Sequence, residues 1–134
     1  MLSDFPPSAT ISVKNLKAAR SFYEGILGFR PIGSTLRAAQ AFKVGGGTVV
    51  IYESQFAGTN QATAVTWSLG EHFDDMVKAL DAKGVPFEHY PMPGIVFEGH
   101  VHVVQDGSPS RVAWFKDPDG NIHNLNNGSP SPAG

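Results

Sequence analysis

The stretch that decides the fold is residues 12–29, which read SVKNLKAARSFYEGILGF. Polar and apolar residues alternate over residues 8–13, the period-two pattern of a strand with two unlike faces. Asn15 then stands where a helix would be capped, and apolar side chains recur every three or four positions over residues 16–27. Gly28 follows where a left-handed residue is favoured at a helix C-terminus. The stretch therefore predicts a strand and a helix that packs on one face of it.

The same pattern returns 56 residues further along the chain. Ser12 corresponds in this repeat to Ser68, and Gly28 corresponds to Gly84, the expected end of a second helix. The first copy continues with expected strands at residues 29–32, 39–44 and 48–53. The second copy has expected strands at residues 64–69, 85–90, 111–116 and 121–126, with a longer connection over about residues 91–110. Each copy is a β-α-β-β-β module, and two modules side by side predict an α+β fold shaped as a curved, incomplete barrel.

The predicted domain plan is a single domain over residues 1–134. Module 1 is expected over about residues 8–57 and module 2 over about residues 62–126. Residues 127–134 are rich in Gly, Ser and Pro and are expected to form a flexible tail. Because each module leaves one sheet face uncovered by its helix, we expect a ligand cleft between the two modules.

The last two strands are joined by an Asp-Pro-Asp-Gly motif whose geometry fixes their register. A three-residue hairpin loop is expected at residues 118–120, with the glycine at its left-handed position. Counting away from that loop sets Trp114 directly opposite Asn124, so the indole and the amide should point the same way. Trp67 is expected on the opposite, helix-facing side of its own strand. His123 should also face that side and is interpreted as a packed or hydrogen-bonded structural residue.

Composition excludes several classes of function. The 134 residues include no cysteine, which excludes disulfide scaffolds, thiolate catalysis and cysteine-based zinc sites. The formal net charge of −2 is too small to indicate a nucleic-acid or membrane partner. No apolar run approaches the ~20 residues that cross a bilayer, and the first residues do not read as a signal peptide. A cytoplasmic protein with a small-molecule partner is therefore expected.

The strand-helix unit ending Phe-Tyr-Glu-Gly-Ile-Leu-Gly-Phe, the Ala-Trp-Phe-Lys-Asp-Pro-Asp-Gly-Asn hairpin and the duplication together resemble the vicinal oxygen chelate superfamily. This superfamily groups glyoxalase I, extradiol dioxygenases, fosfomycin-resistance enzymes and bleomycin-resistance proteins. The resemblance covers about residues 8–126 and implies the two-module fold, a small-molecule cleft and a homodimer. It does not identify the chemistry, because one fold hosts many functions.

The resemblance also implies a divalent metal held by His and Glu residues in the cleft. The corresponding positions here are Ser8, Ala64, Asn124 and one residue among 49–52, where the register is open. None of them offers an imidazole or a carboxylate, which divalent cations need to outcompete water. We therefore expect no cofactor, with a divalent metal as the alternative.

His100 and His102 form a His-x-His pair that provides a weaker metal alternative. If residues 99–104 are extended, both imidazoles point to one face and could serve as two ligands. Two solvated histidines in a half-exposed strand or loop are the competing interpretation. No catalytic residue is assigned.

The predicted ligand cleft combines small polar side chains with an aromatic wall. Trp114 beside Asn124 suits recognition of a planar or amphipathic molecule, although a tryptophan that only fills the core is an equal alternative. Tyr52 could add a phenol if its register turns it inward, with a tyrosine packed at the end of a strand as the favoured alternative. The predicted ligand-cleft residues are Ser8, Thr10, Ser12, Tyr52, Thr66, Trp114 and Asn124.

The function predicted from these residues is a glyoxalase/bleomycin-resistance-like protein that binds a small organic molecule, without the metal usual in the family. A glyoxalase-type lyase or dioxygenase with divergent metal ligands is the alternative. A third possibility is an enzyme that uses acid-base residues without metal. Bound metal would distinguish the second from the others, and turnover would distinguish the third from the first.

Overall fold

The computed structural model describes residues 1–36, 38–105 and 109–129. The predicted flexible tail therefore lies largely outside the described residues. Contacts divide the chain into two compact units, which are described separately. The first comprises residues 1–60 and 118–121, and the second comprises residues 61–117 and 122–129.

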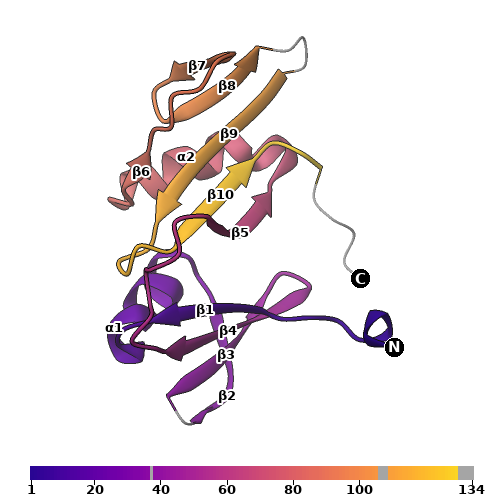
Figure 1. Cartoon of the computed structure of the whole chain (residues 1–134), viewed down its shortest axis with the longest axis vertical. Coiled ribbons are helices and arrows are strands. Elements are labelled where there is room, and N and C mark those ends of the chain that lie inside the picture. The colour runs from indigo at the N-terminus through magenta and orange to yellow at the C-terminus, as the bar shows by residue number, and fades with distance from the viewer. Residues whose placement is uncertain (37, 106–108, 130–134) are drawn as a thin grey trace. The chain divides into compact units, whose positions relative to one another are not determined.

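The first unit is a four-stranded mixed sheet in the order β1-β4-β3-β2, with β1 parallel to β4 (Figure 1). A short 3-10 helix precedes it at Leu2–Asp4. The other elements are β1 (Ala9–Val13), α1 (Leu16–Arg20), a π-helical segment (Ser21–Ile26), β2 (Arg30–Leu36), β3 (Ala39–Val44) and β4 (Gly47–Glu53).

The predicted helix of this unit forms, but it changes type halfway. Asn15 caps it as expected, its side-chain oxygen accepting the backbone N–H of Ala18 at 2.8 Å. From Ser21 onward the chain widens into a π-helix, in which the N–H of Leu27 donates to the carbonyl oxygen of Phe22. Gly28 then ends the segment with a φ of +76°, in agreement with the sequence.

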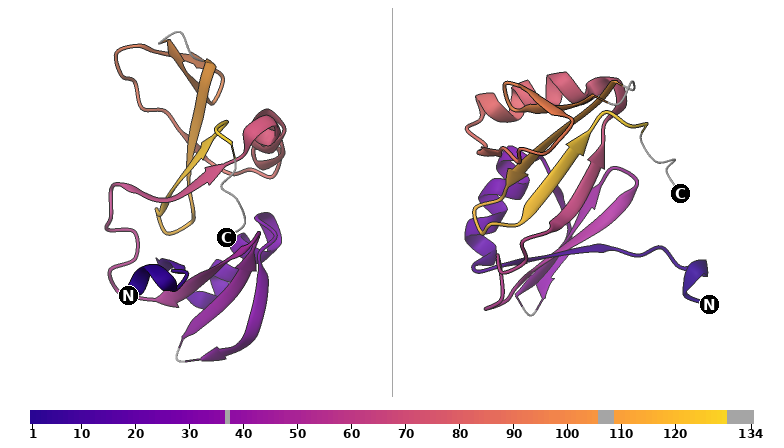
Figure 2. Two further views of the ribbon diagram at one scale, coloured as in Figure 1. Left: turned by 90° about the vertical axis from the view of Figure 1, so that its right-hand side faces the viewer. Right: turned by 45° about the horizontal axis from the view of Figure 1, so that its top comes forward.

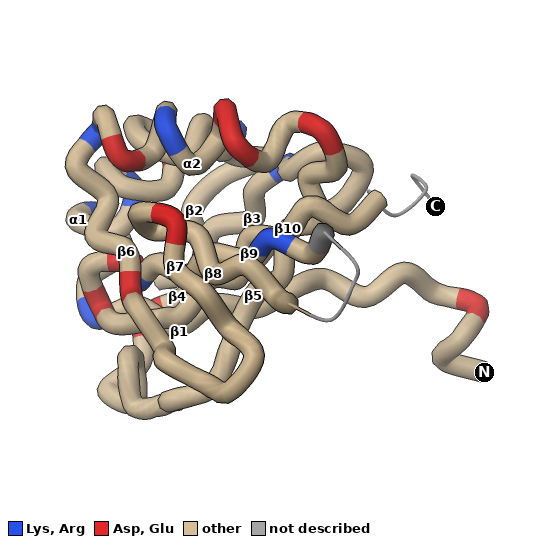
Figure 3. Tube along the Cα trace, turned by 90° about the horizontal axis from the view of Figure 1, so that it is seen from above, with Lys and Arg blue, Asp and Glu red and all other residues tan. Residues whose placement is uncertain are grey.

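The second unit is a larger mixed sheet in the order β5-β10-β9-β8-β7, with β6 also paired to β9. Helix α2 covers one face of this sheet (Figure 2), and acidic and basic residues are interspersed along it (Figure 3). The elements are β5 (Thr63–Ser68), a 3-10 turn (Gly70–His72), α2 (Phe73–Ala82), β6 (Phe87–Glu88), β7 (Ile95–Glu98), β8 (Val101–Gln105), β9 (Pro109–Lys116) and β10 (Ile122–Asn126).

The internal repeat is visible in the pairing of the strands. In each unit the first strand lies parallel to the last, β1 beside β4 and β5 beside β10. Gly84 ends the second helix with a φ of +80°, as Gly28 ends the first. The α+β prediction is confirmed: the described residues form two mixed sheets with few helices, and neither sheet closes into a barrel.

Two expectations for the second unit were wrong. The connection expected over residues 91–110 contains a complete hairpin, β7–β8, which extends the sheet beyond β9. The strand expected over residues 85–90 is only two residues long, Phe87–Glu88. Pro86 lies just before it, and a proline has no backbone N–H to contribute to a strand ladder.

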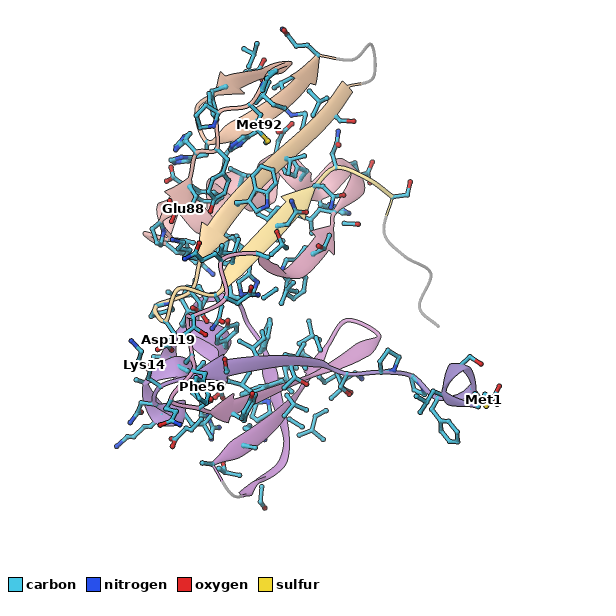
Figure 4. The ribbon with its side chains drawn as sticks, in the orientation of Figure 1. Met1, Lys14, Phe56, Glu88, Met92 and Asp119 are labelled. Carbon is cyan, nitrogen blue, oxygen red and sulfur yellow. The ribbon has the colours of Figure 1, made fainter. Side chains whose placement is uncertain are left out.

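The register predicted for the final hairpin is confirmed. Trp114 pairs with Asn124, and Phe115 pairs with His123. The turn between the strands belongs to the first unit, where the backbone N–H of Lys14 donates to Asp119 Oδ1 at 3.3 Å (Figure 4). Gly58 allows the turn to approach closely, because a Cβ there would lie 1.9 Å from the carbonyl oxygen of Asp119.

No helix of the described chain is long and apolar enough to cross a membrane.

Candidate functional site

The candidate site lies on the face of the second sheet that points away from α2. Asn124 on β10 pairs with Trp114 on β9 and with Thr66 on β5, so the three side chains form a row across three strands. Their neighbours in sequence point the other way, and Phe115 and His123 are fully buried there. Trp114 and Asn124 are partly exposed, and Thr66 is exposed. The row is therefore available on one open face.

Two further rings hold the Trp114 indole from the side. The ring centroid of His102 lies 4.8 Å away and that of Tyr90 lies 5.4 Å away, both in edge-to-face geometry. Phe97 on β7 packs in turn against His102 at 4.6 Å. The added β7–β8 hairpin thus builds an aromatic wall behind Trp114 and restricts the orientation of its ring.

His102 is an internal hydrogen-bond acceptor in this wall. Its Nε2 accepts the backbone N–H of Tyr90 at 2.9 Å, so that nitrogen carries no proton. Burial lowers the pKa of His102 below its usual value, and the neighbouring His89 lowers it further, while the backbone of His100 and Val112 opposes the shift. The neutral ring therefore fixes Tyr90 beside Trp114.

His100 does not lie on an extended segment with His102. The strand begins at Val101, and Gly99 has a φ of +60° in the turn before it. The His100 Nε2 lies 2.9 Å from Asp81 Oδ1 on α2, and its ring stacks on Phe87 at 4.7 Å. Across the described ranges, no three His, Asp or Glu side chains are grouped to hold a metal ion.

Two asparagines of β10 form a hydrogen-bonded pair on the open face. Asn126 Oδ1 accepts the backbone N–H of Gly128 at 2.9 Å, and Asn126 Nδ2 donates to Asn124 Oδ1 at 3.1 Å. Asn126 and Tyr90 were not selected from the sequence. The alternation of Asn124 and Asn126 along the strand could have revealed the first. The second follows from a contact between distant segments, for which the sequence carries no signal.

The remaining predicted residues lie in the first unit. Ser12 pairs with Tyr52, and both lie on the face of that sheet away from its buried core, as Thr10 does. Ser8 is exposed just before β1. The register also settles residues 49–52: Val49 and Ile51 are core residues, whereas Val50 and Tyr52, which is 39% exposed, point the other way. The predicted residues thus form two sets, one in each unit.

The positions at which the family resemblance implies metal ligands do not fit a divalent cation. Ser8 offers a hydroxyl, Ala64 no donor, and Asn124 an amide oxygen that already accepts a hydrogen bond. Val50 and Tyr52 add no carboxylate or imidazole.

The helix-facing side of the same sheet contains a second tryptophan-histidine pair. Trp67 Nε1 donates to His123 Nδ1 at 3.0 Å, and the His123 ring stacks on Phe115 at 4.6 Å. Burial lowers the pKa of His123 from 6.5 to about 4, and the charge of Asp117 opposes this shift. His123 is packed and hydrogen-bonded, as predicted from the sequence.

Comparison with known proteins gives one family. The model of the Glyoxalase/Bleomycin resistance protein/Dioxygenase superfamily matches residues 6–125. No curated protein matches the chain in sequence.

Solved structures of the same fold cover nearly the whole chain. The genomically encoded fosfomycin resistance protein FosX from Listeria monocytogenes superposes with a TM-score of 0.69 at 19% identity, over 93% of both chains. A glyoxalase family protein from Enterococcus faecalis gives a TM-score of 0.69 at 20% identity, over 94% of this chain and 99% of the other. The integron cassette protein HFX_CASS4 from the mobile metagenome of Halifax Harbour sewage outfall gives a TM-score of 0.64 at 25% identity, over 89% of this chain and 94% of the other.

One comparison contradicts the prediction that no cofactor is involved. The Listeria monocytogenes FosX was also solved complexed with Mn(II) and sulfate ion, with a TM-score of 0.66 to this chain at 19% identity. It covers 93% of this chain and 90% of that chain. This fold therefore accommodates a divalent metal, and the absence of His and Glu at four positions was not sufficient ground for predicting no cofactor.

Proposed function

Because this chain belongs to the glyoxalase/bleomycin resistance protein/dioxygenase superfamily, we propose that it binds a small, planar organic molecule against Trp114. The observation that carries the proposal is the fixed indole on the open face of the second sheet. Tyr90 and His102 hold it edge-on, so its ring is ordered before a ligand arrives. A preordered aromatic surface loses little conformational entropy on binding.

The polar surroundings of Trp114 favour an uncharged ligand. Lys116 lies on the same face but pairs with Glu88 at 3.2 Å, and His102 is neutral. The charges that flank the indole therefore cancel. Asn124 and Thr66 add polar groups that can orient a bound molecule by hydrogen bonds.

Fluorescence of Trp114 tests this proposal directly. The variant Trp67→Phe leaves Trp114 as the sole tryptophan of the chain. Titration with a panel of aromatic ketones, phenols and hydrocarbons should quench it saturably. Trp114→Ala, in which binding is followed by calorimetry because the fluorescent reporter is lost, should weaken the best ligand by about 1–3 kcal/mol, the usual contribution of aromatic stacking. Only linear quenching by every compound, as seen for free N-acetyltryptophanamide, would refute the proposal.

A second candidate, a metal-dependent enzyme of the glyoxalase or dioxygenase type, is favoured by the Mn(II) in the FosX of the same fold. Its test is turnover of fosfomycin by this protein with Mn(II) supplied, followed by phosphorus NMR. Turnover that disappears on chelation would support this candidate, and unchanged fosfomycin after long incubation would oppose a reaction like that of FosX.

The family resemblance also supports a homodimer. Light scattering coupled to size-exclusion chromatography tests it, with twice the mass of one chain as the expected result.

A further inference from the structure

The amide of Asn124 is oriented by a relay of two hydrogen bonds. A backbone N–H can only donate, so the atom of Asn126 that faces the N–H of Gly128, 2.9 Å away, must be the amide oxygen. The other end of that amide is then its NH2 group, which donates to Asn124 at 3.1 Å. The Asn124 atom that accepts must likewise be oxygen. The NH2 group of Asn124 is therefore the end left over.

Two neighbouring donors, this NH2 group and the indole N–H of Trp114, make no hydrogen bond within the described residues. Within the described part of the chain, neither Asn124 Nδ2 nor the indole N–H of Trp114 has a hydrogen-bond partner. Asn124 and Trp114 pair directly across β9 and β10, so both donors belong to one face. An N–H group excluded from water without an acceptor costs free energy, so a ligand that covers this face must supply one.

We propose that the ligand is an uncharged planar carbonyl compound whose oxygen accepts from Asn124, and that Asn126 is the positioning residue that directs this donor. The inference rests on the proposed function, because it specifies the ligand for the same face. An aspartate side chain at position 124 would present only acceptors to a ligand. The hydrogen bond from Asn126 instead makes Asn124 present its NH2 group, which is a donor. The paired charges of Glu88 and Lys116 leave no excess charge to bind an anionic ligand.

Conservative variants separate the donor from its support. Asn124→Asp keeps the shape and the oxygen that Asn126 contacts, but it has no NH2 group. Asn126→Asp still accepts from the backbone N–H of Gly128 but cannot donate to Asn124. The Asn124 amide can then rotate, so that its oxygen and its NH2 group exchange places. Gly128→Ala affects the same relay from its far end, because a Cβ there would lie 2.8 Å from Asn126 Oδ1. Asn126→Ala removes the same donor without the negative charge that Asn126→Asp introduces.

Two probes of similar size make the test, acetophenone with a carbonyl oxygen and ethylbenzene without one. Both are titrated against the single-tryptophan Trp67→Phe protein and each variant, and the change in each dissociation constant is compared, so that the difference in probe hydrophobicity cancels. Asn124→Asp should weaken acetophenone about tenfold, and the Asn126 and Gly128 variants about threefold, as loss of one hydrogen bond implies. Ethylbenzene should change by less than about twofold. In the parent protein, acetophenone should also shift the side-chain amide NMR signals of Asn124.

The possible results distinguish the two proposals. Equal weakening of both probes in the Asn126 variants would show a merely structural role and overturn the positioning assignment. Acetophenone binding that is unaffected by Asn124→Asp would overturn the carbonyl inference, while saturable quenching of Trp114 would leave the proposed function standing. If neither probe nor any other aromatic compound quenches Trp114 saturably, both proposals fail.

Discussion

The two faces of the second sheet each carry a tryptophan and a histidine, but they use them differently. On the face toward α2, Trp67 donates to His123 and both rings are packed, so their polar groups are satisfied within the fold. On the opposite face, Trp114 touches His102 edge-on, and its indole N–H has no partner among the described residues. The same residue types thus stabilise the fold on one face and remain available to a ligand on the other. The two roles are distinguished by whether the indole N–H has a hydrogen-bond acceptor within the described fold, more than by residue type.

Acidification should destabilise the fold strongly through the buried face toward α2. The unfolded chain binds a proton at His123 near pH 6.5, whereas the folded chain excludes it until about pH 4. The stabilisation by neutral, buried His123 is therefore fully present above pH 6.5, and about 3 kcal/mol of it is lost as the pH falls to about 4. The lowered pKa of His102 acts in the same direction.

Urea denaturation at pH 7, 5.5 and 4.5 measures this loss. The variant His123→Phe keeps a ring between Trp67 and Phe115 but cannot titrate, so its stability should depend less on pH. An identical pH dependence in the variant and the parent would remove His123 as the cause.

Truncation of the two tryptophans should have opposite consequences for stability and binding. Trp67→Ala removes a packed ring and leaves His123 Nδ1 without its donor, which should lower the free energy of unfolding by about 2–4 kcal/mol. Trp114→Ala should cost only about 1 kcal/mol, because its face is partly open, yet it should abolish ligand-dependent fluorescence changes. Equal stability losses would contradict the distinction between a closed and an open face. Thermal melts with the same protein batches provide the measurement.

The smallest effect is expected at the edge of the open face. Lys116 and Glu88 are both partly exposed, with 42% and 35% of their side chains accessible. Lys116→Gln should therefore change the free energy of unfolding by less than about 0.5 kcal/mol. It should also change acetophenone binding by less than about twofold, because an uncharged probe does not depend on the pair. A tenfold loss of binding would show that charge, contrary to our proposal, recognises the ligand.

The sequence predicted most accurately what depends on short segments. The helix cap at Asn15, the left-handed glycines Gly28 and Gly84, and the pairing of Trp114 with Asn124 were all correct. Each depends on residues that are neighbours in the chain or are joined by a three-residue turn. The π-helical segment within the first helix was missed, because apolar spacing does not distinguish it from an α-helix.

Only part of the candidate site could be predicted from the sequence. Alternation along a strand placed Trp114 and Asn124 on one face, but it could not show that Tyr90 and His102 would surround the indole. Those contacts depend on the β7–β8 hairpin, where the sequence predicted only a longer connection. The expectation of no cofactor was wrong for a related reason: it weighed the residue type at four positions and not what the fold accommodates.

The sequence by itself determined the repeat, the α+β class and the side of the strand from which each tryptophan projects. Side-chain alternation and turn length are properties of the local backbone, so they hold before the chain folds. Only the tertiary structure decided that, among the described residues, the indole N–H of Trp67 meets a hydrogen-bond acceptor and the indole N–H of Trp114 does not. It also decided that Asn124 would present its NH2 group, because that orientation depends on Asn126 and on the N–H of Gly128. Such choices follow from which donors meet which acceptors in three dimensions, and residue spacing does not encode them.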